Sequence, residues 1–162
     1  MYVKLKNGNI YAAGPNEDDT LFIYTLHKEK ADGSFEKTEY GFKRKISLYD
    51  EDVEEYFELK WTFKLDVGEK GVPDEWPVTG DSDLPHGKVV LRFGFGNIPG
   101  WVQDDRGVCH KEYDFNLTTA WWVKKYTEIR NGVKQPGVTW VRTPVSKEEF
   151  VKQYEFYKSS MM

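Results

Sequence analysis

The chain has 162 residues, of which 39% are hydrophobic and 16% aromatic, and its formal net charge at pH 7 is -4. This length suits one domain of ordinary size, and the absence of any apolar run of about 18 residues excludes a membrane-spanning helix. The acidic balance argues against general nucleic-acid binding, which needs a positive surface. We therefore expect residues 1–162 to form a single globular domain with no membrane contact and no nucleic-acid partner.

The expected compartment follows from the first residues and the cysteine count. Residues 1–8 lack the apolar core of a secretory signal, and Cys109 is the only cysteine. One cysteine cannot form an intramolecular disulfide, which fits a reducing compartment. We expect a cytoplasmic protein.

The first third of the sequence predicts hairpins and strands. Asn7-Gly8 separates two short apolar runs, and Asp32-Gly33 separates two runs rich in residues that favour strands. Asn-Gly and Asp-Gly favour the tight turns that join antiparallel strands. Alternating apolar residues over 40–48 predict another half-buried strand.

The most regular alternation covers residues 57–67, from Phe57 to Val67. It predicts one long strand with an apolar face and a charged face, because successive side chains point to opposite sides of a sheet. The next segment, 68–87, contains three prolines and Trp76. It predicts a long loop that either carries function or wraps the surface with Trp76 as an anchor.

This loop ends in a dense group of polar residues, Asp81, Ser82, Asp83 and His86. Carboxylates and an imidazole can bind a cation, and Ser, Asp and His together can serve a hydrolase. The spacing matches no established metal loop, and it places the base almost beside the nucleophile. We therefore predict no metal, no cofactor and no catalytic residue.

A glycine-rich segment follows a predicted strand over 89–95. Gly94–Trp101 contains three glycines, which permit close backbone approach by a ligand. Phe95, Asn97 and Trp101 are the binding residues that this interpretation predicts. A hairpin with a glycine bulge, in which Trp101 packs on the core, explains the same pattern.

A strand predicted over 117–123 places Trp121 and Trp122 on opposite faces. If Trp121 faces the core, Trp122 faces outward and forms an aromatic and cationic patch. The residues expected in this patch, our main candidate for a contact surface, are Trp122, Lys124 and Tyr126. The alternative is that Trp122 is buried because the C-terminal helix packs over it.

The end of the chain predicts a hairpin at Asn131-Gly132 and a helix capped by Ser146, with Glu149 completing a capping box. Phe150, Val151, Tyr154 and Tyr157 fall on one helical face. The whole pattern predicts a mainly β (α+β) fold: an antiparallel β-sandwich or partly closed barrel with a C-terminal amphipathic helix.

These features favour a non-catalytic binding protein that occupies a partner protein. Small acidic chains of this kind suit inhibitors from mobile elements, including anti-defence proteins of the anti-CRISPR type. The alternative is a β-barrel that binds or sequesters a small nucleotide-like or sugar-like ligand on aromatic side chains. A hydrolase that uses residues 80–86 is the third interpretation.

Overall fold

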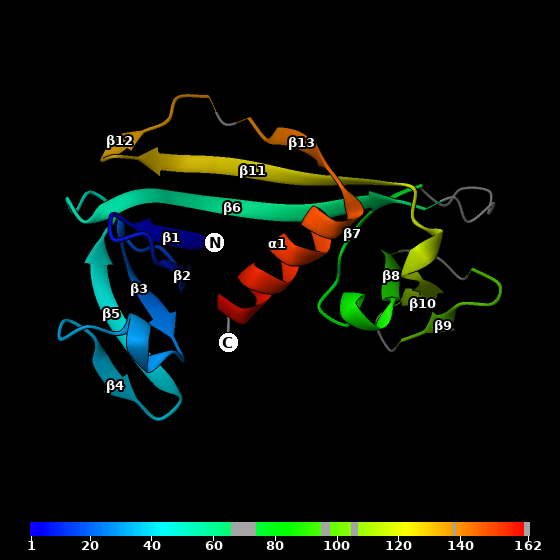
Figure 1. Cartoon of the computed structure of the whole chain (residues 1–162), viewed down its shortest axis with the longest axis horizontal. Helices are drawn as coiled ribbons and strands as arrows, with labels where there is room; N and C mark the ends of the chain where they lie inside the picture. The colour runs from blue at the N-terminus through cyan, green and yellow to red at the C-terminus, as the bar shows by residue number, and fades with distance from the viewer. Residues whose placement is uncertain (66–73, 95–97, 105–106, 138, 161–162) are drawn as a thin grey trace. The chain divides into compact units, whose positions relative to one another are not determined.

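A computed structural model describes residues 1–65, 74–94, 98–104, 107–137 and 139–160. Val67, Phe95 and Asn97, which the sequence assigns to a strand and a binding loop, lie outside these residues. Within them the fold is mainly β, with antiparallel sheets and one C-terminal helix (Figure 1). The fold class predicted from the sequence is therefore confirmed.

The contacts within the chain form two compact units. Unit 1 comprises Met1–Leu59, Lys125–Val141 and Gln153–Met162, and unit 2 comprises Lys60–Lys124 and Arg142–Lys152. Strands β6 (Val53–Lys64) and β11 (Ala120–Arg130) and helix α1 (Lys147–Ser160) each contribute residues to both units. The single domain expected over 1–162 stays a prediction.

Unit 1 is built on an open sheet with the strand order β12-β11-β6-β1-β2-β3-β5-β4. The sheet does not close into a barrel, which agrees with the sandwich-like form of the two that the sequence allowed. Its further elements are β1 (Tyr2–Leu5), β2 (Ile10–Ala13), β3 (Thr20–Thr25), the 3-10 turn η1 (Lys28–Lys30), β4 (Glu36–Thr38), β5 (Gly41–Ser47) and β12 (Val133–Lys134).

Two of the three predicted hairpins form. Gly8, at φ 91°, lies between β1 and β2, and Asn131 and Gly132, at φ 49° and 75°, join β11 to β12. Positive φ at both central residues is what a type I′ turn requires. The hairpin predicted at Asp32-Gly33 is wrong, because β3 and β4 each pair with β5 and not with each other.

Side chains pack on both faces of the unit 1 sheet. Tyr56 of β6 belongs to a cluster of buried residues, Val3, Leu5, Tyr11, Leu21, Ile23, Ile46, Leu48, Val53, Tyr56 and Ile129. The next residue, Phe57, belongs to an aromatic layer in which the Tyr2 ring lies 5.8 Å from Phe57 and 5.0 Å from Tyr157 of α1. Burial raises the pKa of Tyr2 to about 12. Phe57, the first residue of the apolar face that the alternation predicted, is buried, and Tyr56, which precedes that alternation, makes the opposite face of β6 apolar at this point.

Unit 2 contains the C-terminal part of β6 paired with β7 (Glu75–Pro77), and the start of β11 paired with β13 (Val141–Val145). β6 and β11 are themselves neighbours, which gives the strand order β13-β11-β6-β7 here. A separate sheet has the order β8-β10-β9, from β8 (Lys88–Gly94), β10 (Val108–Asp114) and β9 (Val102–Gln103). Two 3-10 turns, η2 (Leu84–His86) and η3 (Phe115–Leu117), complete the unit.

Two sequence expectations need correction in unit 2. Part of the loop expected over 68–87 is regular, since it includes β7 and η2, and Trp76 is buried there. The strand expected from residue 117 begins at Ala120, because Asp114 accepts the Asn116 N–H at 2.8 Å and starts η3. Leu117 is consequently 58% exposed and does not face the core.

The C-terminal helix begins where its cap predicts. Ser146 Oγ accepts the backbone N–H of Glu149 at 3.1 Å. In unit 2, Phe150 is fully buried and its ring stacks on Phe115 at 6.1 Å. No helix in the described part of the chain has the length and apolar character needed to cross a membrane.

Candidate functional site

The β13-β11-β6-β7 sheet of unit 2 has a buried face and an outer face. Lys64 pairs with Glu75 across β6 and β7, and Phe63 pairs with Trp76. Phe63 and Trp76 are buried. Because side chains alternate along a strand, Glu75 and Lys64 lie on the opposite face, termed the outer face below.

Glu75 is the centre of a polar group on the outer face. Its carboxylate accepts a hydrogen bond from Thr62 Oγ1 at 3.1 Å and pairs with Lys124 Nζ at 3.2 Å and Arg142 Nη2 at 3.3 Å. The Arg142 guanidinium in turn lies over the Trp122 ring, with Cζ 3.9 Å from the centroid. These residues, Thr62, Glu75, Trp122, Lys124 and Arg142, form the Trp122–Arg142 cluster.

The electrostatics of the cluster keep Glu75 ionised. Burial raises the pKa of the Glu75 carboxyl, but hydrogen bonds from Lys124 and Thr62 and the charges of Lys124 and Arg142 outweigh burial, so the pKa lies below its ordinary value. Two cations around one carboxylate leave the cluster with a positive charge in an acidic protein. The cluster therefore suits an acidic group of a partner.

The structure places the residues of the predicted patch in two groups. Trp122 and Lys124 share the outer face, and Trp122 is half-buried with Arg142 covering one side of its ring. Trp121, on the other face, is half-buried and donates its Nε1–H to Thr118 Oγ1 at 2.9 Å. Tyr126 belongs to unit 1, where its ring lies 5.4 Å from Trp140.

The Gly94–Trp101 segment does not present its tryptophan to solvent. Trp101 is buried, and its ring lies 5.9 Å from Trp76 and 6.3 Å from Tyr113. This agrees with the alternative in which Trp101 packs on the core. Phe95 and Asn97, the other residues expected to bind here, are outside the described residues.

Sequence reasoning did not find Glu75 and Arg142. Glu75 lies in a segment whose sequence predicts a loop, and Arg142 lies on a different strand from Trp122. The pairing of distant strands that joins them leaves no local pattern. The short β-branched run Val141–Val145 is the signal that could have placed Arg142 on a strand.

The polar residues at 81–86 do not converge on a common point. Asp81 pairs with Arg92, whereas Asp83 Oδ2 lies 2.8 Å from His86 Nδ1. In the ranges that the structure describes, no group of three or more His, Cys, Asp or Glu residues could hold a metal ion. The two carboxylates of this segment are thus engaged by separate partners.

Ser82 has a structural environment. The side chain is buried, and its Oγ accepts the Val90 N–H at 2.9 Å and lies 3.3 Å from Thr79 Oγ1. The His86 imidazole is engaged by Asp83 instead. This geometry supports no activation of the Ser82 hydroxyl by His86.

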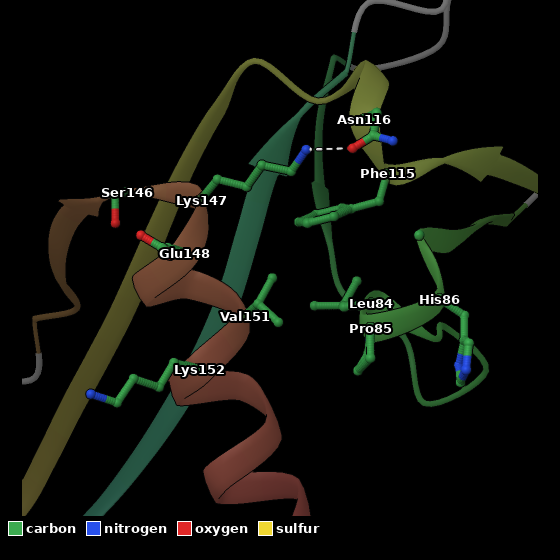
Figure 2. A pocket seen from close by; sticks show the side chains of 11 residues that line it. Leu84, Pro85, His86, Phe115, Asn116, Ser146, Lys147, Glu148, Val151 and Lys152 are labelled. Carbon is green, nitrogen blue, oxygen red and sulfur yellow. Dashed lines mark hydrogen bonds between the residues drawn. The ribbon is translucent and has the colours of Figure 1, made fainter.

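Unit 2 also contains a pocket of about 940 Å³ beside the start of α1 (Figure 2). Its apolar lining consists of Leu84, Pro85, Phe115 and Val151, and its polar lining includes His86, Asn116, Ser146, Lys147, Glu148 and Lys152. Lys147 Nζ donates to Asn116 Oδ1 at 2.7 Å and lies 5.1 Å from the centroid of Phe115. A cation is thereby held beside an apolar floor.

Unit 1 has a smaller hollow of about 450 Å³, lined in part by Tyr24, Leu26, Tyr40 and Gly41. Tyr40 and Leu26 are 80% and 53% exposed. Gly41 has φ 149°, and a Cβ atom on it would lie 2.7 Å from the Thr25 carbonyl oxygen. The hollow therefore depends on glycine at this position.

Comparisons of the chain with protein-family models, with curated proteins and with solved structures find no match.

Proposed function

We propose that the chain is a non-catalytic binding protein that occupies a partner protein through the Trp122–Arg142 cluster. The observation that supports this most is that Arg142 stacks on Trp122 at 3.9 Å while Glu75 holds the same guanidinium at 3.3 Å. Trp and Arg dominate the binding energy of protein interfaces. A side chain that is already fixed loses little conformational entropy when it binds.

The partner segment is expected to be acidic. The side chain of Arg142 is 44% exposed and that of Lys124 27%, so both cations remain within reach of a carboxylate. Their joint charge exceeds that of Glu75, and charge complementarity guides partners to such a surface. A partner carboxylate would share the two cations with Glu75.

Contact through side chains is favoured over addition of a strand. Among the described strands, β13 pairs only with β11, which leaves it at an edge of the sheet. Pro144 lies within β13 and has no backbone N–H to donate to a further strand. A partner can therefore contact β13 through its exposed side chains, which include Arg142.

The identity of the partner is a separate proposal. A host-defence protein, inhibited by this chain as the product of a mobile element, is the class that the small acidic sequence suggests. The small-ligand alternative is tested in the same preparation, by extracting the purified protein and identifying bound molecules by mass spectrometry.

The experiment captures partners on the tagged protein in lysate from the source cells and measures their affinity for matched variants. Trp122→Ala is expected to weaken binding by about 2 kcal/mol, close to thirtyfold. Trp121→Ala, on the opposite face, is expected to leave affinity unchanged in protein whose circular dichroism is native. Equal affinities for wild type and Trp122→Ala would overturn the proposal.

A further inference from the structure

We propose that the pocket of unit 2 binds a small amphipathic carboxylate, with Lys147 as the residue that holds its anionic end. The pocket shares no lining residue with the Trp122–Arg142 cluster. The proposal is therefore independent of the partner-binding function.

The apolar part of the pocket is already in place without a ligand. Figure 2 shows Leu84, Phe115 and Val151 directed toward a common space from η2, η3 and α1. Leu84 and Phe115 are 4% and 2% exposed, and Phe115 is held by stacking on Phe150. The volume of about 940 Å³ lies within the range of small-molecule sites. Leu84 and Phe115 form the buried base of the pocket, and the more exposed Pro85 and Val151 offer the apolar surface that a ligand can cover. Removal of the ligand's own apolar surface from water supplies the affinity.

The charged group nearest the apolar part of the pocket is the ammonium of Lys147, which the protein holds in place. Lys147 reaches across the rim to Asn116, and its Nζ lies above the Phe115 ring (Figure 2). An ammonium has three N–H donors, and the hydrogen bond to Asn116 uses one. The remaining donors suit a carboxylate whose apolar end lies against Pro85 and Val151.

The other charged lining residues lie away from this point. Glu148 is at the Ser146 end of the rim, and Lys152 extends away from Phe115 (Figure 2). His86 is exposed and paired with Asp83. One cation therefore meets the ligand, which favours a monoanion over a nucleoside phosphate with several negative charges.

The test compares two fluorescent probes with the same aromatic framework on the full chain. Anilinonaphthalene sulfonate carries one negative charge, and N-phenyl-1-naphthylamine carries none. We expect the sulfonate to bind the wild type about fivefold more tightly than the neutral probe, and decanoate to displace it. Lys147→Gln is expected to remove this preference and to leave the affinity of the neutral probe within about twofold.

Lys158→Gln is the matched control, because it removes the same charge from the same helix at a residue that does not line the pocket. It should leave both affinities within about twofold of wild type. Equal losses in Lys147→Gln and Lys158→Gln would overturn the proposal, since they would show that the loss of any positive charge on α1 weakens binding of the sulfonate. Failure of decanoate to displace the sulfonate, or equal wild-type affinities for the two probes, would overturn it as well. Circular dichroism of each variant checks that its fold is native.

Discussion

The guanidinium of Arg142 lies 3.9 Å from the ring centroid of Trp122, on the outer face of the unit 2 sheet. Stacking of this kind stabilises both side chains, because the negative face of the ring attracts the cation. It also explains how a tryptophan can lie on the polar face of β11, where it is only half-buried. Glu75 completes the arrangement from β7 by pairing with Arg142 and Lys124.

The first prediction concerns Glu75 and pH. Its folded-state pKa is depressed by its cationic and hydroxyl neighbours, so its contribution to stability is present above the ordinary carboxyl pKa of about 4.3 and is lost as the pH falls through the folded value. Glu75→Gln should destabilise the protein by about 1 kcal/mol at neutral pH, since the carboxylate is partly exposed. The difference from wild type should shrink below about pH 4. Urea unfolding of both proteins across this range measures it.

Asp74→Asn is the control for that experiment. Asp74 pairs with Lys64 at 3.8 Å, and its side chain is 65% exposed. Its removal should change stability by less than about 0.5 kcal/mol at any pH. A Glu75→Gln effect that is the same in acid as at neutral pH would show that the carboxylate charge does not stabilise the cluster.

A second prediction concerns Trp76, the central residue of β7. Trp76 is 3% exposed and packs on Trp101 and Phe93, yet its Nε1–H has no hydrogen-bond partner among the described atoms. Trp76→Ala should cost about 3 to 5 kcal/mol through the cavity it leaves. Trp76→Phe should cost less than half as much, because it also removes a buried unsatisfied donor. Similar unfolding midpoints for the two variants would contradict this packing.

A third prediction uses two glycines of unit 1. Gly41→Ala should destabilise the protein by about 1 to 3 kcal/mol, because the residue has φ 149° and a new Cβ would lie 2.7 Å from the Thr25 oxygen and 2.8 Å from Leu26 Cδ2. Gly33→Ala should leave stability unchanged or raise it by up to about 1 kcal/mol, since nothing lies within 4 Å of its Cβ position. Thermal unfolding separates the two. A neutral Gly41→Ala would show that the backbone at Gly41 does not approach Thr25 and Leu26 this closely.

The parts of the fold that the sequence predicted are those with a local cause. The alternation from Phe57 produces β6, Asn131-Gly132 produces a hairpin, and Ser146 caps α1. The Asp32-Gly33 turn failed as a hairpin because η1 separates the runs and both pair with β5. Which strand a run pairs with depends on contacts distant in sequence, and no local pattern records them.

The same limit applied to the candidate site. Alternation along β11 was enough to put Trp122 and Lys124 on one face, because that face is set within a single strand. The cation that covers Trp122 and the carboxylate that joins it to Lys124 come from β13 and β7. Their positions depend on which strands pair: β13 pairs with β11, and β7 pairs with β6. Glu75 and Lys124 are more than forty residues apart in the chain and meet because β6 and β11 are neighbours.

The proposed contact between Arg142 and the partner is measured by the affinity of Arg142→Ala for the captured partner. Arg130→Ala is the matched control, because Arg130 is exposed and paired with Glu55 in unit 1. We predict that Arg142→Ala weakens binding by about 2 kcal/mol and that Arg130→Ala changes it by less than about 0.5 kcal/mol. Wild-type affinity in folded Arg142→Ala would contradict the proposed contact.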